Sequence, residues 1–296
     1  MQNNLSLRSA LAASVGGALE WYDFIIYGFF TEVLGQQFFP DNNEYSRHLL
    51  IFGIFAVGYW ARAVGGLIFG HIGDKYGRSR SLFITMFLGG VATICMAVMP
   101  NYEHFGVIAS LLFVIARLVQ GVTIGANISG AIVYISELTS RKSRSFWIST
   151  LFLGTQRGVM LAGVVSAVLF TYLTWGQLHS WGWRVAFLVG VLVMLLAWYS
   201  KWHLIETPYH LELQRDHQVA ASPVYLFFSQ YKLITIIGMG LNTIFSISIT
   251  FMLFYMPTFM RDYGFLPKEV MHATFYHIFM FSLILPIFGI ISDHIG

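Results

Sequence analysis

The stretch GIFAVGYWARAVGGLIFGHIGDKYGRSR, residues 53–80, joins an apolar, glycine-rich run to a charged turn. The turn contains Gly70, Asp74, Lys75, Gly77 and Arg78. The chain ends on the same spacing, because Gly289, Asp293 and Gly296 repeat it after another apolar run. Two apolar runs that lead into matching charged turns predict a chain built from two halves on one plan.

The composition of the chain identifies a membrane protein. Of its 296 residues, 56% are hydrophobic and only 10% are charged, whereas soluble domains carry roughly 25% charged residues. The apolar runs are continuous, and strands of a membrane barrel would alternate polar with apolar residues, so the spans are predicted to be helices. The single cysteine, Cys95, excludes a disulfide framework and a cysteine metal site.

Eight apolar runs approach or exceed the roughly 20 residues that a spanning helix needs. They lie near residues 11–34, 49–72, 81–99, 105–134, 145–173, 185–204, 233–259 and 270–292. We therefore predict an N-terminal six-helix transmembrane bundle over 1–205, a cytoplasmic inter-domain linker over 206–230, and an incomplete second bundle of two spans over 231–296. A signal peptide at the start is disfavoured, because Glu20 and Asp23 interrupt the first run.

The basic residues set the predicted orientation. With the N-terminus inside, the cytoplasmic segments hold ten of them, namely Arg8, Lys75, Arg78, Arg80, Arg141, Lys142, Arg144, Lys201, Arg215 and Lys232. The outer segments hold four, namely Arg47, Arg184, Arg261 and Lys268. This bias predicts a cytoplasmic N-terminus, with both charged turns on the cytoplasmic side.

Charged residues inside the predicted spans point to function. A charge at the middle of a bilayer costs about 3 kcal/mol or more, so it needs a partner or an aqueous cavity. Glu20, Asp23 and Tyr27 share one face of the first span, Arg62 lies in the second, and Arg117 and Gln120 lie in the fourth. Acids and arginines on different spans predict buried pairing. The functional hypothesis is a proton-coupled solute site, and the alternative is a static ion pair that fixes helix packing.

Arg157 lies near the middle of the fifth span. Either it attracts an anionic group in the cavity, or it forms a structural pair with an acid of another span. The three arginines within spans outnumber the two acids, Glu20 and Asp23, which favours an anionic or zwitterionic solute.

Small and aromatic residues have mainly structural interpretations. Gly121, Gly125 and Ser129 form a row of small residues that predicts close helix packing. Trp181 and Trp183 are predicted to anchor the chain at a membrane interface. Tyr27 and Tyr59 are candidates to line a cavity, with ordinary packing as the alternative.

Acids and bases that gather at the cytoplasmic ends of the spans predict a latch between helices. Asp74 ends the second span, Arg78 opens the third, and Glu137 ends the fourth. The alternative is that the basic residues only fix the topology.

These residues also resemble a known family. Gly70-x-x-x-Asp74-Lys75-x-Gly77-Arg78 resembles the loop 2–3 signature of the major facilitator superfamily, and Arg117-x-x-Gln120-Gly121 resembles its fourth-span motif. More narrowly, GALEWYDFIIYG at 17–28, RLVQGVTIGA at 117–126, WGWRVAF at 181–187 and ETP at 206–208 resemble the metabolite:H+ symporters, which include proline/betaine, alpha-ketoglutarate, citrate and shikimate carriers.

The resemblance implies a major facilitator fold of twelve helices in two bundles, alternating access, and no cofactor besides the proton gradient. It implies symport of protons with a small carboxylate or zwitterion, such as betaine or proline. It places the protein in the bacterial inner membrane and implies no nucleic-acid partner. The predicted proton-coupling and solute-cavity residues are Glu20, Asp23, Tyr27, Arg62, Arg117, Gln120, Asn127 and Arg157. The predicted cytoplasmic gating residues are Gly70, Asp74, Lys75, Gly77, Arg78, Glu137, Arg144 and Asp293. No catalytic or metal-binding residue is predicted.

The chain departs from this family pattern in four places. Ala63 stands where the family has a proline, Ser79 where it has a basic residue, and Asn127 where it has an acid, while Arg157 is not expected. Gly296 falls after two spans of the second bundle, so we expect a C-terminally truncated chain. It would be a fragment, the product of a truncated open reading frame, or a shortened protein that must associate to work. The alternative functions are a non-transporting remnant or a receptor. No HExxH, GxSxG or phosphate-loop motif supports an enzyme.

Overall fold

The computed structural model describes residues 2–40, 44–201, 204–215 and 229–295, which form helices joined by turns, without a strand. The helices of the first half are α1 (Gln2–Phe29), α2 (Thr31–Phe38), α3 (Glu44–Tyr76), α4 (Arg78–Val98), α5 (Tyr102–Phe105), α6 (Val107–Leu138), α7 (Arg144–Tyr172), α8 (Trp175–Gln177), the π-helical turn η1 (Leu178–Gly182) and α9 (Trp183–Lys201). They are followed by α10 (Pro208–Arg215), α12 (Lys232–Thr250), the π-helical turn η2 (Phe251–Tyr255), α13 (Met256–Asp262) and α14 (Pro267–Ile295).

All eight predicted spans are helices, which confirms the all-α membrane architecture. Six segments of the described ranges are long and apolar enough to cross a bilayer: 78–98, 107–138, 144–172, 175–196, 232–249 and 272–295. Helices α1 and α3 are also long enough, at 28 and 33 residues, and they carry several of the buried polar side chains described below. The predicted linker contains the short helix α10, which the sequence did not indicate, and residues 216–228 of that linker lie outside the described residues.

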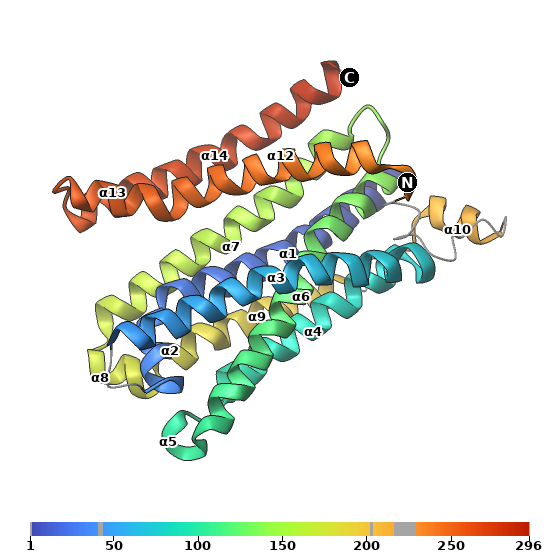
Figure 1. Cartoon of the computed structure of the whole chain (residues 1–296). Helices are drawn as coiled ribbons and strands as arrows, with labels where there is room; N and C mark the ends of the chain where they lie inside the picture. Colours follow the sequence, from blue (N-terminus) through green and yellow to red (C-terminus); the bar gives the residue numbers. More distant parts are fainter. Residues whose placement is uncertain (1, 41–43, 202–203, 216–228, 296) are drawn as a thin grey trace.

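The long helices run between two ends of the molecule (Figure 1). Both termini and α10 lie at one end, here called the terminal end, and α2, α5, α8 and α13 lie at the opposite end. Helices α1, α3, α4, α6, α7 and α9 form a bundle in which α1 packs on α7 and α9, and α6 packs on α3 and α4. Helix α14 packs on α7, so α7 joins the second half of the chain to the first.

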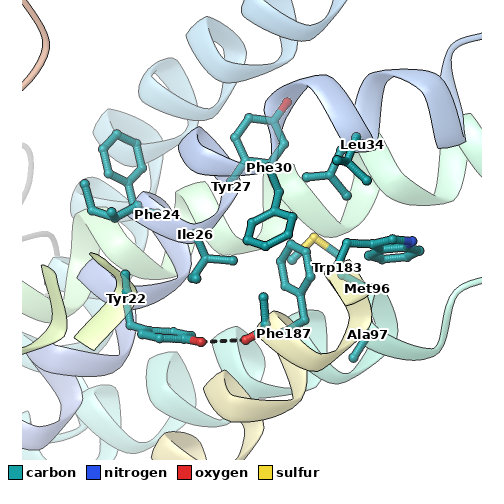
Figure 2. Close-up of a cluster of buried hydrophobic side chains, with 14 of the residues drawn as sticks. Tyr22, Phe24, Ile26, Tyr27, Phe30, Leu34, Met96, Ala97, Trp183 and Phe187 are labelled. Atoms are coloured by element: carbon teal, nitrogen blue, oxygen red, sulfur yellow. Dashed lines mark hydrogen bonds between the residues drawn. The ribbon is translucent and has the colours of Figure 1, made fainter. Parts of the chain in front are cut away.

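Aromatic side chains fill the core at the end opposite the termini. The Phe38 ring stacks on Phe113, with 4.4 Å between centroids, and meets Trp183 edge-on at 5.7 Å. Figure 2 shows this cluster, in which the Tyr22 hydroxyl donates to the Ala186 carbonyl at 2.6 Å. Trp183 is fully buried, so its predicted role as an interfacial anchor is wrong. It begins α9 on the face that also carries Phe187, and this face packs on the core.

Glycines bring α3 and α6 into backbone contact. A Cβ atom added at Gly125 would lie 1.9 Å from the Arg62 carbonyl oxygen, and one at Gly121 would lie 2.5 Å from that of Gly58. This contact confirms the close packing predicted for the small-residue row. It also fixes the part of α3 that carries Arg62 directly against α6.

Candidate functional site

A network of buried polar side chains connects α1, α4 and α6 in the interior of the bundle. Asp23 on α1 accepts hydrogen bonds at Oδ2 from the Thr93 hydroxyl of α4 and from Gln120 Nε2 of α6, the latter at 3.3 Å. Gln120 Nε2 also donates to Thr93 Oγ1 at 2.9 Å. All three side chains are buried. We call these three residues, together with Arg117 and Tyr27, the central polar network.

Arg117 reaches Asp23 only through Gln120. Its NH1 group donates to Gln120 Oε1 at 2.7 Å, and its guanidinium carbon lies 3.5 Å from the centre of the Tyr27 ring. Within the described ranges, ion pairs with an N–O distance of 4.0 Å or less occur only around Arg78. The buried acid and arginine are therefore linked through the Gln120 amide and form no direct ion pair. Gln120 lies one turn after Arg117 on α6, and its amide separates the two charges.

Arg62 forms no direct ion pair among the described residues, although Glu20 is near enough to interact with its charge. Its guanidinium carbon lies 4.3 Å from the Phe24 ring centre and 4.4 Å from the Tyr59 ring centre. Cation–π contacts of this kind stabilise a desolvated guanidinium by about 2 kcal/mol. The two aromatic rings therefore hold the Arg62 guanidinium in place beside a cavity that it helps to line.

Two small cavities flank the network and carry opposite charge. The acid cavity has Glu20, Asp23, Thr85, Gln120, Thr123 and Asn127 as its polar lining residues. The arginine cavity is lined by Phe24, Ile54, Gly58, Arg62, Arg117, Gln120, Gly121 and Ile124. Neither arginine lines the acid cavity, and neither acid lines the arginine cavity. Gln120 lies in the walls of both, so its amide forms part of the partition.

Several buried polar atoms at these cavities have no hydrogen-bond partner among the described residues. They are Glu20 Oε2, Asp23 Oδ1, Arg117 Nε and NH2, and Asn127 Nδ2 and Oδ1. A buried polar group left unpaired costs about 1–3 kcal/mol, and such groups in native proteins call for an explanation. Their concentration around two cavities is the pattern expected of a site that binds ligands.

A second polar network closes the terminal end of the bundle. Arg78 contacts Asp74 at 2.5 Å and Glu137 at 3.2 Å, which brings together the three residues predicted to form the latch. Glu206 Oε1 accepts from the Arg78 backbone N–H at 2.9 Å, and the Thr207 hydroxyl donates to Glu137 Oε2 at 2.6 Å. We call these five residues the charged-turn network.

Glu206 and Thr207 of this network were not predicted from the sequence. They belong to the ETP motif at 206–208, which resembles the metabolite:H+ symporters but indicates no role for either residue. Gly77 makes room for the contact, since its φ of 114° places it in the left-handed region and a Cβ there would lie 2.4 Å from Glu206 Oε2.

Asp293, from the repeated turn, binds the N-terminus of α7. Its two carboxylate oxygens accept from the backbone N–H groups of Ser145 and Phe146, at 2.7 and 2.9 Å. A carboxylate at this position satisfies two of the unpaired donors of the helix start and complements the positive end of its dipole. This contact ties α14 to the first bundle.

Four predicted site residues belong neither to these networks nor to the cavity walls, and they do not share the contacts described for Gly77 and Asp293. Arg157 is exposed on α7 and lines neither cavity. Lys75 is exposed, with its ammonium 5.4 Å from the Tyr76 ring centre. Arg144 begins α7 with its Nε atom unpartnered among the described residues, and Gly70 faces open space.

Comparison with known proteins agrees with this architecture. The family described as "Sugar (and other) transporter" matches residues 9–226. The chain belongs to this family. A solved structure of the proton:xylose symporter XylE bound to 6-bromo-6-deoxy-D-glucose superimposes with a TM-score of 0.75 at 20% identity, over 99% of this chain and 70% of XylE. The human organic anion transporter MFSD10 gives 0.61 at 14% identity, over 96% of this chain and 72% of that one. At these identities the likeness shows the fold.

Curated relatives of this transporter-family chain are more similar in sequence. A putative proline/betaine transporter of Staphylococcus haemolyticus is 36% identical over 202 residues, which cover 68% of this chain and 43% of that protein. The proline/betaine transporter of Escherichia coli K12 is 30% identical over 309 residues, which cover 98% of this chain and 60% of that protein. The chain thus spans about half the length of these relatives. They are transporters rather than enzymes, as the sequence predicted for this chain.

Proposed function

We propose that the chain carries the coupling site of a proton-coupled symporter for a small carboxylate or zwitterion. The observation that carries this proposal is the separation of Asp23 from Arg117 by Gln120, between an acid cavity and an arginine cavity. We expect the proton to bind to an acid and the carboxylate of the solute to bind to the arginines. The side-chain amide of Gln120 lies between these two binding sites.

Asp23 is the proposed proton carrier. In its charged form it accepts hydrogen bonds from Thr93 and Gln120. Protonation removes the negative charge and weakens both bonds, because the carboxylate is the stronger acceptor. Gln120 is then released to reorient, and Arg117 loses the indirect pull of the acid. The proton on Asp23 thereby makes Arg117 a better site for an anionic group.

Arg117 and Arg62 are the proposed anchors of the solute. Arg117 has two donor groups, Nε and NH2, without a partner among the described residues, and a planar guanidinium binds carboxylates with two parallel bonds. Proline and betaine, which the relatives carry by name, each bear one carboxylate and one cationic nitrogen. The aromatic rings of Phe24 and Tyr27 beside the arginines suit the apolar body of such a solute.

The charged-turn network is the proposed gate on the cytoplasmic side of a bacterial inner membrane, with the N-terminus inside. The contacts of Arg78 with Asp74 and Glu137, and of Asp293 with α7, hold the terminal end closed. Opening toward the cytoplasm requires Asp293 to leave α7. The proton gradient, with no bound cofactor, drives the cycle of alternating access.

The test is uptake of radiolabelled proline or betaine into proteoliposomes with an imposed pH gradient. Asp23→Asn is expected to abolish uphill accumulation while exchange of solute across the membrane continues. Glu103→Gln, on the exposed short helix α5, is the control and should accumulate solute normally. Uphill accumulation in Asp23→Asn would show that the proton does not travel on Asp23. Saturable solute binding without any pH-driven accumulation in the unmodified protein would favour the receptor alternative.

A further inference from the structure

Glu20 is a buried acid that the proposed proton cycle does not use. Its residue surface is 7% exposed, and its Oε2 atom has no hydrogen-bond partner among the described residues. No lysine or arginine nitrogen of those residues lies within 4.0 Å of its carboxylate. Arg62, on the neighbouring α3, stacks on two aromatic rings and lines the other cavity. A charged carboxylate in this setting requires a positive charge beside it.

Asn127 is the second unpaired group in the same cavity. Its surface is 2% exposed, and neither amide atom has a hydrogen-bond partner among the residues that the structure describes. It approaches α1 one turn before Glu20, because its Nδ2 atom lies 3.2 Å from a Cβ placed at Gly16. Glu20 and Asn127 therefore face one cavity, and the Asn127 amide interacts with the Glu20 carboxylate. Glu20 Oε2 and Asn127 Oδ1 still lack a hydrogen bond of normal geometry among the described residues, and an ion between them would use both oxygens.

The donor set of the acid cavity is that of a hard cation. It offers carboxylate oxygens of Glu20 and Asp23, the Asn127 amide oxygen, and hydroxyl oxygens of Thr85 and Thr123. The two threonine hydroxyls donate their protons to the carbonyls of Leu82 and Gln120, both at 2.9 Å, so their oxygens keep lone pairs for an ion. Oxygen-only ligands suit hard alkali and alkaline-earth ions rather than transition metals.

The charge balance selects a monovalent ion. Asp23 is already compensated by two hydrogen-bond donors and, through Gln120, by Arg117. Glu20 adds a second negative charge, and the cation that interacts with it, Arg62, forms no direct ion pair with it and lines the other cavity. We propose that the acid cavity binds one Na+ ion between Glu20 and Asn127, beside the proton site on Asp23 and separate from it.

The experiment measures Na+ binding to the purified full chain in detergent. Equilibrium binding of 22Na+ and the thermal unfolding midpoint are followed in NaCl, KCl and choline chloride at constant ionic strength. We expect saturable binding of one Na+ per chain and a midpoint that rises with Na+ but not with K+ or choline. Both signals should disappear in Glu20→Gln and in Asn127→Leu.

Two further variants separate loss of a ligand from loss of the fold. Asn127→Asp keeps an oxygen in place and should bind Na+ at least as well as the unmodified chain. Glu103→Gln, far from the cavity on α5, should show the unmodified Na+ response. If Asn127→Leu and Asn127→Asp both unfold earlier in choline but only Asn127→Asp is rescued by Na+, the ligand role is supported.

The proposal would be overturned by the absence of a Na+-specific signal in the unmodified chain, or by an undiminished signal in Glu20→Gln. Release of a single proton from Glu20 without any Na+ response would identify a proton as the occupant and would also overturn it. These outcomes are independent of the transport proposal, because pH-driven uptake by Asp23 does not require Na+ in the acid cavity. Conversely, Na+ binding in a protein without uptake would support this site and contradict only the transport proposal.

Discussion

The central polar network and the charged-turn network use the same residue types in opposite arrangements. At the terminal end, Arg78 touches two acids directly, and the side chains of the Arg78–Asp74 pair are 19% and 36% exposed. In the middle of the bundle, Arg117 and Asp23 are buried and are separated by Gln120.

This difference follows from the cost of separating charges. A partly exposed pair contributes only about 0–1 kcal/mol, so it forms and breaks easily during a conformational change. Removing one partner of a buried direct pair costs about 3–5 kcal/mol, which makes such a pair rigid. An amide between the buried charges leaves each one responsive to its own ligand. The central polar network is thus suited to binding and the charged-turn network to gating.

Arg117→Leu should give the largest effect. It removes the hydrogen bond to Gln120 and the contact with the Tyr27 ring, together about 3 kcal/mol, which corresponds to about a 100-fold loss of uptake rate. Arg117→Lys keeps the charge but not the planar donor group, so it should lose less, about tenfold. Initial rates in proteoliposomes measure both. Rates within fivefold of the unmodified protein for Arg117→Leu would remove Arg117 from the site.

Gly190→Ala tests how tightly Asp23 is positioned. A Cβ at this residue of α9 would lie 2.6 Å from Asp23 Oδ1 and 3.2 Å from both Thr93 and Tyr22. Overpacking of this kind costs about 1–3 kcal/mol, and we expect about a tenfold loss of uphill accumulation with a shifted pH profile. Gly163→Ala on α7 is the matched control, because nothing lies within 4 Å of its added Cβ. An unchanged pH profile of uptake in Gly190→Ala would mean that protonation of Asp23 does not depend on the space beside Gly190.

Arg78→Ala tests the charged-turn network. Because its ion pairs are partly exposed, we expect only about 1 kcal/mol of stability to be lost, yet the terminal end should open more often. Labelling of a cysteine introduced beside Thr207 measures this opening, and it should become several-fold faster. Arg80→Ala, exposed two residues away, is the control. Equal labelling rates in both variants would contradict a gating role.

Asp293→Asn should have the smallest effect on stability. The amide keeps one acceptor for the N-terminus of α7 but loses the charge, worth about 0.3–1 kcal/mol at a helix terminus. We expect a slightly lower unfolding midpoint and easier separation of α14 from α7, measured by cross-linking between Ser145 and Ser292 replaced by cysteines, because their hydroxyl oxygens lie 3.2 Å apart. Asp262→Asn, on the exposed end of α13, should leave cross-linking unchanged. More efficient cross-linking in Asp293→Asn would contradict a stabilising contact between the Asp293 carboxylate and the N-terminus of α7.

The sequence was sufficient for the helices and for part of each network. Continuous apolar runs located the eight spans, and the four-residue spacing within the charged turn placed Arg78 directly on Asp74. Thr93 was not predicted, because one hydroxyl within an apolar run carries no signal until α4 is packed against α1. The sequence predicted buried pairing of acids and arginines, but sequence spacing cannot show that Gln120 lies between Asp23 and Arg117.

Two other residues depended on tertiary packing. Trp183 follows an exposed Trp181, and only the π-helical turn before α9 shows that the second ring points into the core. Arg157 lies in an apolar run like Arg117, but it faces away from both cavities' walls. For such residues, the face of the helix decides the role, and an apolar run does not reveal it.

The most direct test of the account is the simultaneous measurement of proton and solute influx in proteoliposomes, with and without Gln120. Solute that enters proteoliposomes through the unmodified protein is expected to be accompanied by protons. In Gln120→Leu, solute should move down its gradient with little or no proton influx, because the amide between Asp23 and Arg117 is gone. Proton influx that remains proportional to solute influx in Gln120→Leu would contradict coupling through this residue.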